Sequence, residues 1–119
     1  PSTLLLEDPL VAVLAESGVV RRLLLYLLEA HRFRVLLARD VEGLLRLLKS
    51  RPKGVILQGE KAVEAARKVR ATPEGRLASP YLVSETPPGL LPRPLRLLHL
   101  PKPLRSQEVL KALEPLRRG

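Results

Sequence analysis

The chain has no cysteine, only three aromatic residues and no long apolar run. Without cysteine it forms neither disulfide bonds nor thiolate metal sites, which fits a reducing cytoplasm. Because the aromatic residues are only Tyr26, Phe33 and Tyr81, leucine and valine must supply most of the core. No apolar run approaches the roughly 20 residues of a membrane span, and no signal peptide is visible. We therefore expect a cytoplasmic protein that does not enter a membrane.

The length and composition indicate a single folded domain. A chain of 119 residues is long enough to bury about two thirds of its unfolded surface. Hydrophobic residues make up 45% of it, so disorder is not expected. We expect Tyr26 and Tyr81 to lie in the core or at a sheet edge. The 12 prolines and the excess of arginine over lysine are typical of a thermophile or of a GC-rich genome.

The net charge of +9 allows two interpretations. A basic surface can bind nucleic acid, acidic lipid or an acidic protein. It can also be a solvated surface with few acids. Basic residues are scattered from Arg21 to Arg118, the longest basic run is two, and three aromatic residues offer few platforms to stack on bases. These features favour the solvated surface. Nucleic-acid binding through basic faces that include Arg21, Arg22, Arg117 and Arg118 is kept as an alternative.

Short apolar segments alternate with segments that carry an apolar helical stripe. Strands are predicted over Leu10–Ala15, Phe33–Ala38, Gly54–Gln58, Pro80–Ser84 and Leu95–Leu100. Helices are predicted over Val19–Ala30, Val41–Ser50, Glu60–Ala71 and Ser106–Leu116. This alternation predicts an α/β fold with a doubly wound, five-stranded parallel sheet covered on both faces. The expected strand order is the flavodoxin-like 2-1-3-4-5.

Three segments depart from the alternation. Residues 85–94 carry four prolines, which remove amide donors, so helix four is expected to be shortened or missing. Residues 72–79 contain Pro73 and Gly75 and are predicted to form a polar loop. Residues 1–9 are predicted to be an N-terminal extension or an extra edge strand before a domain that spans residues 10–119.

The segment at the end of the fifth predicted strand resembles a known family. It reads Leu98-His99-Leu100-Pro101-Lys102-Pro103-Leu104. In its place after an apolar run and before a capped helix, it is similar to the lysine and usually cis proline of receiver domains in two-component response regulators. The order of elements from residue 10 to residue 118 supports the same resemblance. The resemblance implies a receiver-like, flavodoxin-like domain.

The resemblance also implies where a phosphorylation pocket would lie. Two acids follow the first strand of receivers, and their positions fall on Ala15 and Glu16. The position of the acceptor aspartate falls on Gln58, and that of a hydroxyl falls on Ser84 or Glu85. The position of a lysine falls on Lys102, and that of a switch aromatic residue falls on His99. A carboxylate can form an acyl phosphate, whereas the carboxamide of Gln58 cannot. Mg²⁺ prefers carboxylate oxygens, and the resemblance gives two of the three acidic positions to neutral residues. We therefore expect a degenerate receiver that has no cofactor and binds no specific metal.

The remaining side chains of this pocket have structural interpretations. Glu16 is expected to form an ion pair with Lys102, and Lys102 alternatively bonds to Gln58 or to backbone carbonyls. His99 is expected to be packed. Ser84 has no histidine–acid partner in view, and no glycine-rich phosphate loop occurs, so the chain is not expected to be an enzyme.

The favoured hypothesis is a phosphorylation-independent signalling module that binds another protein or associates with itself. A shortened helix four would leave a leucine-lined surface around Leu90, Leu91, Leu95 and Leu97. The first alternative is the basic nucleic-acid-binding domain described above. The second is a domain that binds a small anion or nucleotide at the carboxyl ends of the strands, where open α/β sheets bind ligands.

Overall fold

The computed structural model describes residues 8–85 and 96–118. Five strands form one parallel sheet in the order β2-β1-β3-β4-β5, as predicted. The strands are β1 (Leu10–Ala15), β2 (Arg34–Ala38), β3 (Gly54–Gln58), β4 (Ser79–Ser84) and β5 (Leu98–Pro101). The alternation of apolar strands with helices therefore gave the correct fold class, and the fold is doubly wound.

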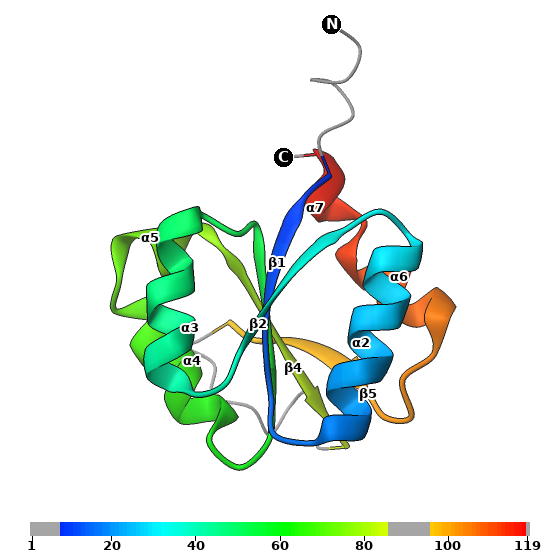
Figure 1. Cartoon of the computed structure of the whole chain (residues 1–119), viewed down its shortest axis with the longest axis horizontal. Coiled ribbons are helices and arrows are strands. Elements are labelled where there is room, and N and C mark those ends of the chain that lie inside the picture. Colours follow the sequence, from blue (N-terminus) through cyan, green and yellow to red (C-terminus); the bar gives the residue numbers. More distant parts are fainter. Residues whose placement is uncertain (1–7, 86–95, 119) are drawn as a thin grey trace, which may run out of the picture.

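Helices cover both faces of the sheet (Figure 1). They are α2 (Gly18–Ala30), α3 (Val41–Leu47), the 3₁₀ turn η1 (Leu48–Ser50), α4 (Ala62–Arg70), α5 (Pro73–Leu77), α6 (Ser106–Leu113) and α7 (Pro115–Arg118). The helices α2, α6 and α7 pack on one face, while α3, α4 and α5 pack on the other. No described helix is both long enough and apolar enough to pass through a lipid bilayer.

β1 is an interior strand between β2 and β3, and its side chains contribute to both layers of the core. Val11 and Val13 point to the face covered by α2 and α6, while Ala12 and Leu14 point to the face covered by α3 and α4. The side chains of β1 alternate between faces because successive residues of a strand do so. Both faces are apolar, as expected for a strand covered by helices on each side.

Several boundaries differ from the sequence-based prediction. Residues 73–77 form the short helix α5 and not a polar loop, because Thr72 Oγ1 accepts a hydrogen bond from the Gly75 amide at 2.9 Å and Pro73 opens the helix. The predicted last helix is divided into α6 and α7 at Pro115, which has no amide hydrogen to continue α6. β5 begins at Leu98, after Arg96 in a left-handed conformation (φ 51°).

The two tyrosines lie in different environments. Tyr81 on β4 is fully buried, as predicted, and its hydroxyl donates a hydrogen bond to the Ala112 carbonyl at 2.9 Å. This bond joins the sheet to α6, and burial raises the pKa of Tyr81 above its ordinary value of 10.0. Tyr26 on α2 is exposed, so its predicted place in the core or at a sheet edge was wrong. It lies on the side of α2 that faces away from the sheet.

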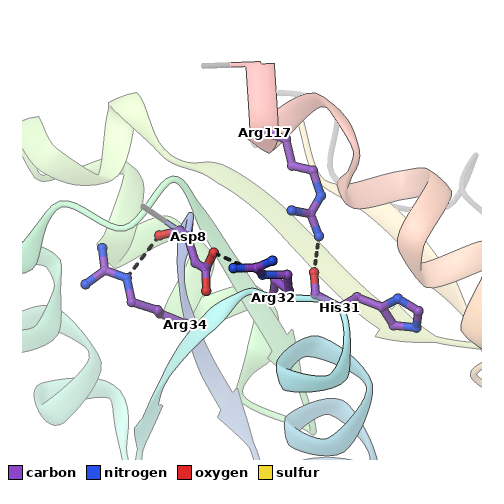
Figure 2. A network of polar contacts seen from close by, with 5 residues as sticks. All are labelled: Asp8, His31, Arg32, Arg34 and Arg117. Atoms are coloured by element: carbon purple, nitrogen blue, oxygen red, sulfur yellow. Dashed lines mark hydrogen bonds and ion pairs between the residues drawn. The ribbon is translucent and has the colours of Figure 1, made fainter. Parts of the chain in front are cut away.

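A group of arginines closes the end of the molecule where the strands begin (Figure 2). The Arg34 Nε donates to the Asp8 carbonyl at 3.0 Å, and Arg32 forms an exposed ion pair with the Asp8 carboxylate. Arg117 of α7 lies over the Phe33 ring at 4.4 Å and donates to the His31 carbonyl. The C-terminal helix is thereby fastened over the chain that leads from α2 into β2.

Some sequence-based predictions fall on residues that lie outside the described ranges. These are the proposed extension or extra strand at residues 1–7, the shortened helix four, and the surface leucines Leu90, Leu91 and Leu95. Leu97 is described. It is half-buried and packs against the core layer under α3 and α4.

The hydrogen bond of Tyr81 gives a testable expectation. Tyr81→Phe removes the hydroxyl and leaves the Ala112 carbonyl without its donor, so the free energy of unfolding should fall by about 1 kcal/mol. Since burial raises the folded-state pKa of Tyr81, the wild type should also lose stability as the pH rises above the unfolded value of 10.0 and through the folded value. The Tyr81→Phe variant should lack this part of the alkaline decline.

Urea denaturation at neutral and at alkaline pH measures both effects. Tyr26→Phe is the matched control, because the Tyr26 side chain is exposed and its hydroxyl makes no described contact. Equal stability of the Tyr81→Phe and Tyr26→Phe variants would contradict the role assigned to the buried hydroxyl.

Candidate functional site

The carboxyl ends of β1 and β3 lie side by side and carry neutral residues. Ala15 and Gln58 are paired in the parallel register of the two strands. Ala15 is buried and Gln58 is half-buried. Strand register alone brings these two positions together, as the resemblance to receivers implied. No carboxylate occupies either position, so neither side chain can act as an anionic nucleophile.

The carboxamide of Gln58 has a structural partner. Its Oε1 accepts a hydrogen bond from the Ser17 amide at 2.9 Å, across 41 residues of sequence. Ser17 is also the N-cap of α2, and its Oγ accepts from the Val20 amide at 3.3 Å. Gln58 therefore satisfies a backbone donor next to the first turn of the helix, a group that otherwise needs water or another acceptor. The amide joins β3 to the start of α2.

Glu16 folds over the loop that follows β3. Its Oε2 accepts a hydrogen bond from the Lys61 amide at 3.1 Å, and its own amide donates to the Gln58 carbonyl at 3.1 Å. The side chain lies against Gly59, where a Cβ atom would be 2.4 Å from Glu16 Cδ. Gly59 also has φ +123°, a conformation that other residues rarely adopt. The carboxylate of Glu16 thus holds the β3–α4 connection.

Ser84 and Glu85 lie at the end of β4, His99 lies within β5, and Lys102 directly follows β5. The Nε2 of His99 donates to the Ser84 carbonyl at 2.6 Å, so the half-buried histidine bridges the two strands. Glu85 and Lys102 are exposed. The Lys102–Pro103 peptide bond is cis, as the resemblance implied.

Lys102 makes neither of two expected contacts among the described residues, and Glu16 and Gln58 are bonded to other groups. Among the described residues, no ion pair joins Glu16 to Lys102, and the Glu16 carboxylate accepts from the Lys61 amide. Lys102 makes no described bond to Gln58, whose Oε1 is bonded to Ser17. None of the hydrogen bonds described here joins the side chains at the ends of β1 and β3 to those at β4 and β5.

A cleft of about 490 Å³ opens beside the first group, between the carboxyl ends of the strands and the start of α3 and α4. Glu16 and Gln58 line it, whereas Ser84 and Lys102 do not. Acidic side chains outnumber basic ones in its lining: Glu16, Asp40, Glu42, Glu60 and Glu64 against Arg39, Lys61 and Lys68. Within residues 8–85 and 96–118, no three histidine, aspartate or glutamate side chains are grouped closely enough to hold a metal ion.

Three residues of the site were missed from the sequence. Ser17 binds Gln58, Lys61 supplies the amide that Glu16 accepts, and Gly59 provides the space for the Glu16 side chain. A signal for Ser17 is present, since a serine directly before an apolar helical stripe is a typical N-cap. No local signal shows that a glutamine 41 residues away binds its amide.

With this geometry in place, comparison with solved structures identifies the fold. CheY4 of Vibrio cholerae, a chemotaxis response regulator, matches with a TM-score of 0.81 and 19% identity, over 92% of this chain and 98% of that one. A putative response regulator of Chloroflexus aurantiacus matches with a TM-score of 0.81 and 16% identity, over 94% and 99% of the two chains.

A third similar structure carries a metal ion. The receiver domain of the sensor histidine kinase PA1611 of Pseudomonas aeruginosa has magnesium coordinated in its active-site cleft, and it matches with a TM-score of 0.74 and 17% identity, over 94% of this chain and 99% of that one. No protein-family model matches the chain, and no curated protein is significantly similar in sequence. The chain therefore has the receiver fold of response regulators.

Gly59→Ala tests how Glu16 and Gly59 fit together. The added methyl group meets the Glu16 side chain, and the positive φ is unfavourable for alanine, so the free energy of unfolding should fall by about 1–3 kcal/mol. Gly18→Ala is the matched control, since its added Cβ would meet nothing closer than 3.5 Å. Denaturant titration measures both variants. Similar stabilities for the two would contradict the close packing described here.

Proposed function

We propose that this domain is a phosphorylation-independent, receiver-like signalling module that acts by binding another protein. The observation that carries the proposal is the amide at the end of β3. Gln58 stands beside Ala15, and its Oε1 is bonded to the Ser17 amide at 2.9 Å. A neutral amide that forms a structural hydrogen bond is a poor substitute for an ionised nucleophile.

The charge around Gln58 supports the same proposal. Phosphoryl transfer depends on cations that neutralise the negative charge developing on the transferred group. Magnesium is held for this purpose by carboxylate oxygens in octahedral geometry. Here the Ala15 side chain supplies no oxygen, and the nearby Glu16 carboxylate already accepts from the Lys61 amide. Lys102 is exposed and makes no described contact with this group.

The partner surface is proposed to include β5 and the chain before it. β5 is an edge strand, and Leu98 is 46% exposed at its start. An exposed leucine on a sheet edge gives a partner an apolar contact. Leu90, Leu91 and Leu95 belong to this proposed surface, although they lie outside the described residues. Leu97 contributes from the opposite face of the sheet, where it is half-buried.

Neither alternative function gains support from the described residues. Arg21 donates to the Ala15 carbonyl at 3.1 Å, and Arg117 is held by Phe33 and His31. Arg21 is in the first turn of α2, just after the end of β1, whereas α7, which carries Arg117, lies at the end of the sheet where β1 begins (Figure 1), so the two arginines do not form one basic surface for nucleic acid. The acidic majority in the cleft likewise disfavours a phosphate or nucleotide at that place.

Phosphoryl transfer to this domain is directly measurable. After incubation with acetyl phosphate and Mg²⁺, intact-mass measurement should find no added phosphoryl group on this domain. A receiver that retains its acceptor aspartate, treated in the same way, is the positive control. A mass gain of one phosphoryl group on this chain would end the proposal of phosphorylation independence.

The proposed surface at β5 is tested by two leucine variants. Leu98→Asp places a charge on the β5 edge, whereas the control Leu77→Asp places one on α5, where the leucine is also exposed. Proteins captured by the wild type should be retained by Leu77→Asp and reduced at least about tenfold by Leu98→Asp, since a charge in an apolar contact is costly. Circular dichroism checks that both variants fold. Equal capture by the two would place the partner surface elsewhere.

A further inference from the structure

The outer side of α2 carries an apolar stripe that the fold does not bury. Val19, Leu23 and Tyr26 are 75%, 36% and 71% exposed, and Ala30 is exposed in line with them. We call these four residues the α2 seam. Their spacings of four, three and four residues are those of a coiled-coil seam, which lies on one side of a helix. The seam is therefore a continuous apolar line on the surface.

Exposed large hydrophobic side chains are concentrated on α2. The described residues include six exposed large hydrophobic side chains, and three of them are on α2: Val19, Leu23 and Tyr26. The other three are on β2, α5 and β5. Single exposed hydrophobic residues are ordinary, but a row of them on one helix indicates a surface that packs against another helix.

The seam has a charged flank with a definite arrangement. Arg22 and Glu29 are both exposed, are seven residues apart and so occupy the same position of the heptad, directly before Leu23 and Ala30. Neither side chain makes a hydrogen bond or ion pair among the described residues. The flank on the other side is different, because Val20 and Leu27 are buried against the sheet. Only one side of the seam thus presents charges to a partner.

We propose that two copies of this domain pair through α2, with the two helices antiparallel and related by a two-fold axis. In that arrangement Leu23 of each copy packs against Tyr26 of the other, and Val19 of each lies opposite Ala30. The charged flanks of the two helices then face each other. Arg22 of each copy comes within reach of Glu29 of the other, which gives two equivalent ion pairs.

A second copy fits this surface because the surface is complementary to itself. A two-fold interface uses the same residues on both sides, so it requires each attractive group to find its counterpart on an identical chain. The flank supplies one base and one acid at equivalent heptad positions, as an antiparallel pair requires. In a parallel pair the charged flank would face Val20 and Leu27, which are buried in the domain.

The pairing is expected to be weak and dependent on concentration. One face of a 13-residue helix gives an interface at the small end of the range for specific complexes. The net charge of +9 on each copy opposes association, but this repulsion is screened over about 8 Å at physiological salt. The proposal is independent of the partner surface at β5, which is formed by other residues.

Charge reversal tests the pairing and its direction. Sedimentation equilibrium at 0.15 M salt, from about 10 μM to about 1 mM protein, should show a monomer–dimer equilibrium for the wild type. Arg22→Glu gives a chain with two acids on the flank, and Glu29→Arg gives a chain with two bases. Each variant alone should dimerise at least about tenfold more weakly, because like charges then face each other.

Mixing the two variants is the decisive measurement. An equimolar mixture of Arg22→Glu and Glu29→Arg should form a mixed dimer about as strong as the wild-type dimer, since both ion pairs are restored with reversed polarity. The control Arg67→Glu makes the same charge change on the exposed side of α4 and should leave dimerisation unchanged within about threefold. Tyr26→Glu should abolish the dimer.

Several results would overturn the proposal. These are a wild type that stays monomeric up to the highest concentration, a mixture no stronger than its components, and a dimer that survives Tyr26→Glu. Circular dichroism establishes that the variants fold, which is expected because all of the changed side chains are exposed.

Discussion

The burial of β1 is the constraint on which the remaining structure depends. This strand has β2 and β3 on its two sides and a layer of helices on each face. Its residues from Val11 to Ala15 are all buried. A strand in that position fixes the register of both neighbours, since a shift of one residue would turn each side chain to the opposite core. The pairing of Ala15 with Gln58, and with it the character of the site, follows from that register.

At this site, structural hydrogen bonds occupy the groups that a reaction would need. Gln58 and Glu16 each accept a backbone amide, and both bonds connect the end of a strand to a nearby helix or loop. Gln58 is half-buried, and a polar group that is partly buried is costly when it has no partner, so its bond has a stabilising role without any ligand. Glu16 is exposed, and its bond holds the loop after β3. The two side chains are thereby explained as parts of the scaffold.

The sequence was sufficient for the fold because its strongest signals are local. Apolar strands and helical stripes gave the strand order, and Gln58 was placed correctly because it ends one of those strands. Contacts between distant residues were not accessible in this way. The Ser17–Gln58 bond joins residues 41 positions apart in the sequence. The exposure of Tyr26 depends on which side of α2 faces the sheet. Short elements such as α5 were missed since a single capping residue decides them.

The two outer strands of the sheet differ in how readily they would accept a foreign strand. Beyond Leu98, β5 leads into Pro101 and Pro103, which have no amide hydrogen to offer to an incoming chain. β2 has a complete row of amides, and protection there comes from the charges of Arg34 at its start and Arg39 just after its end. Ordered aggregation of this protein would therefore begin on the β2 side, and its onset would depend on ionic strength.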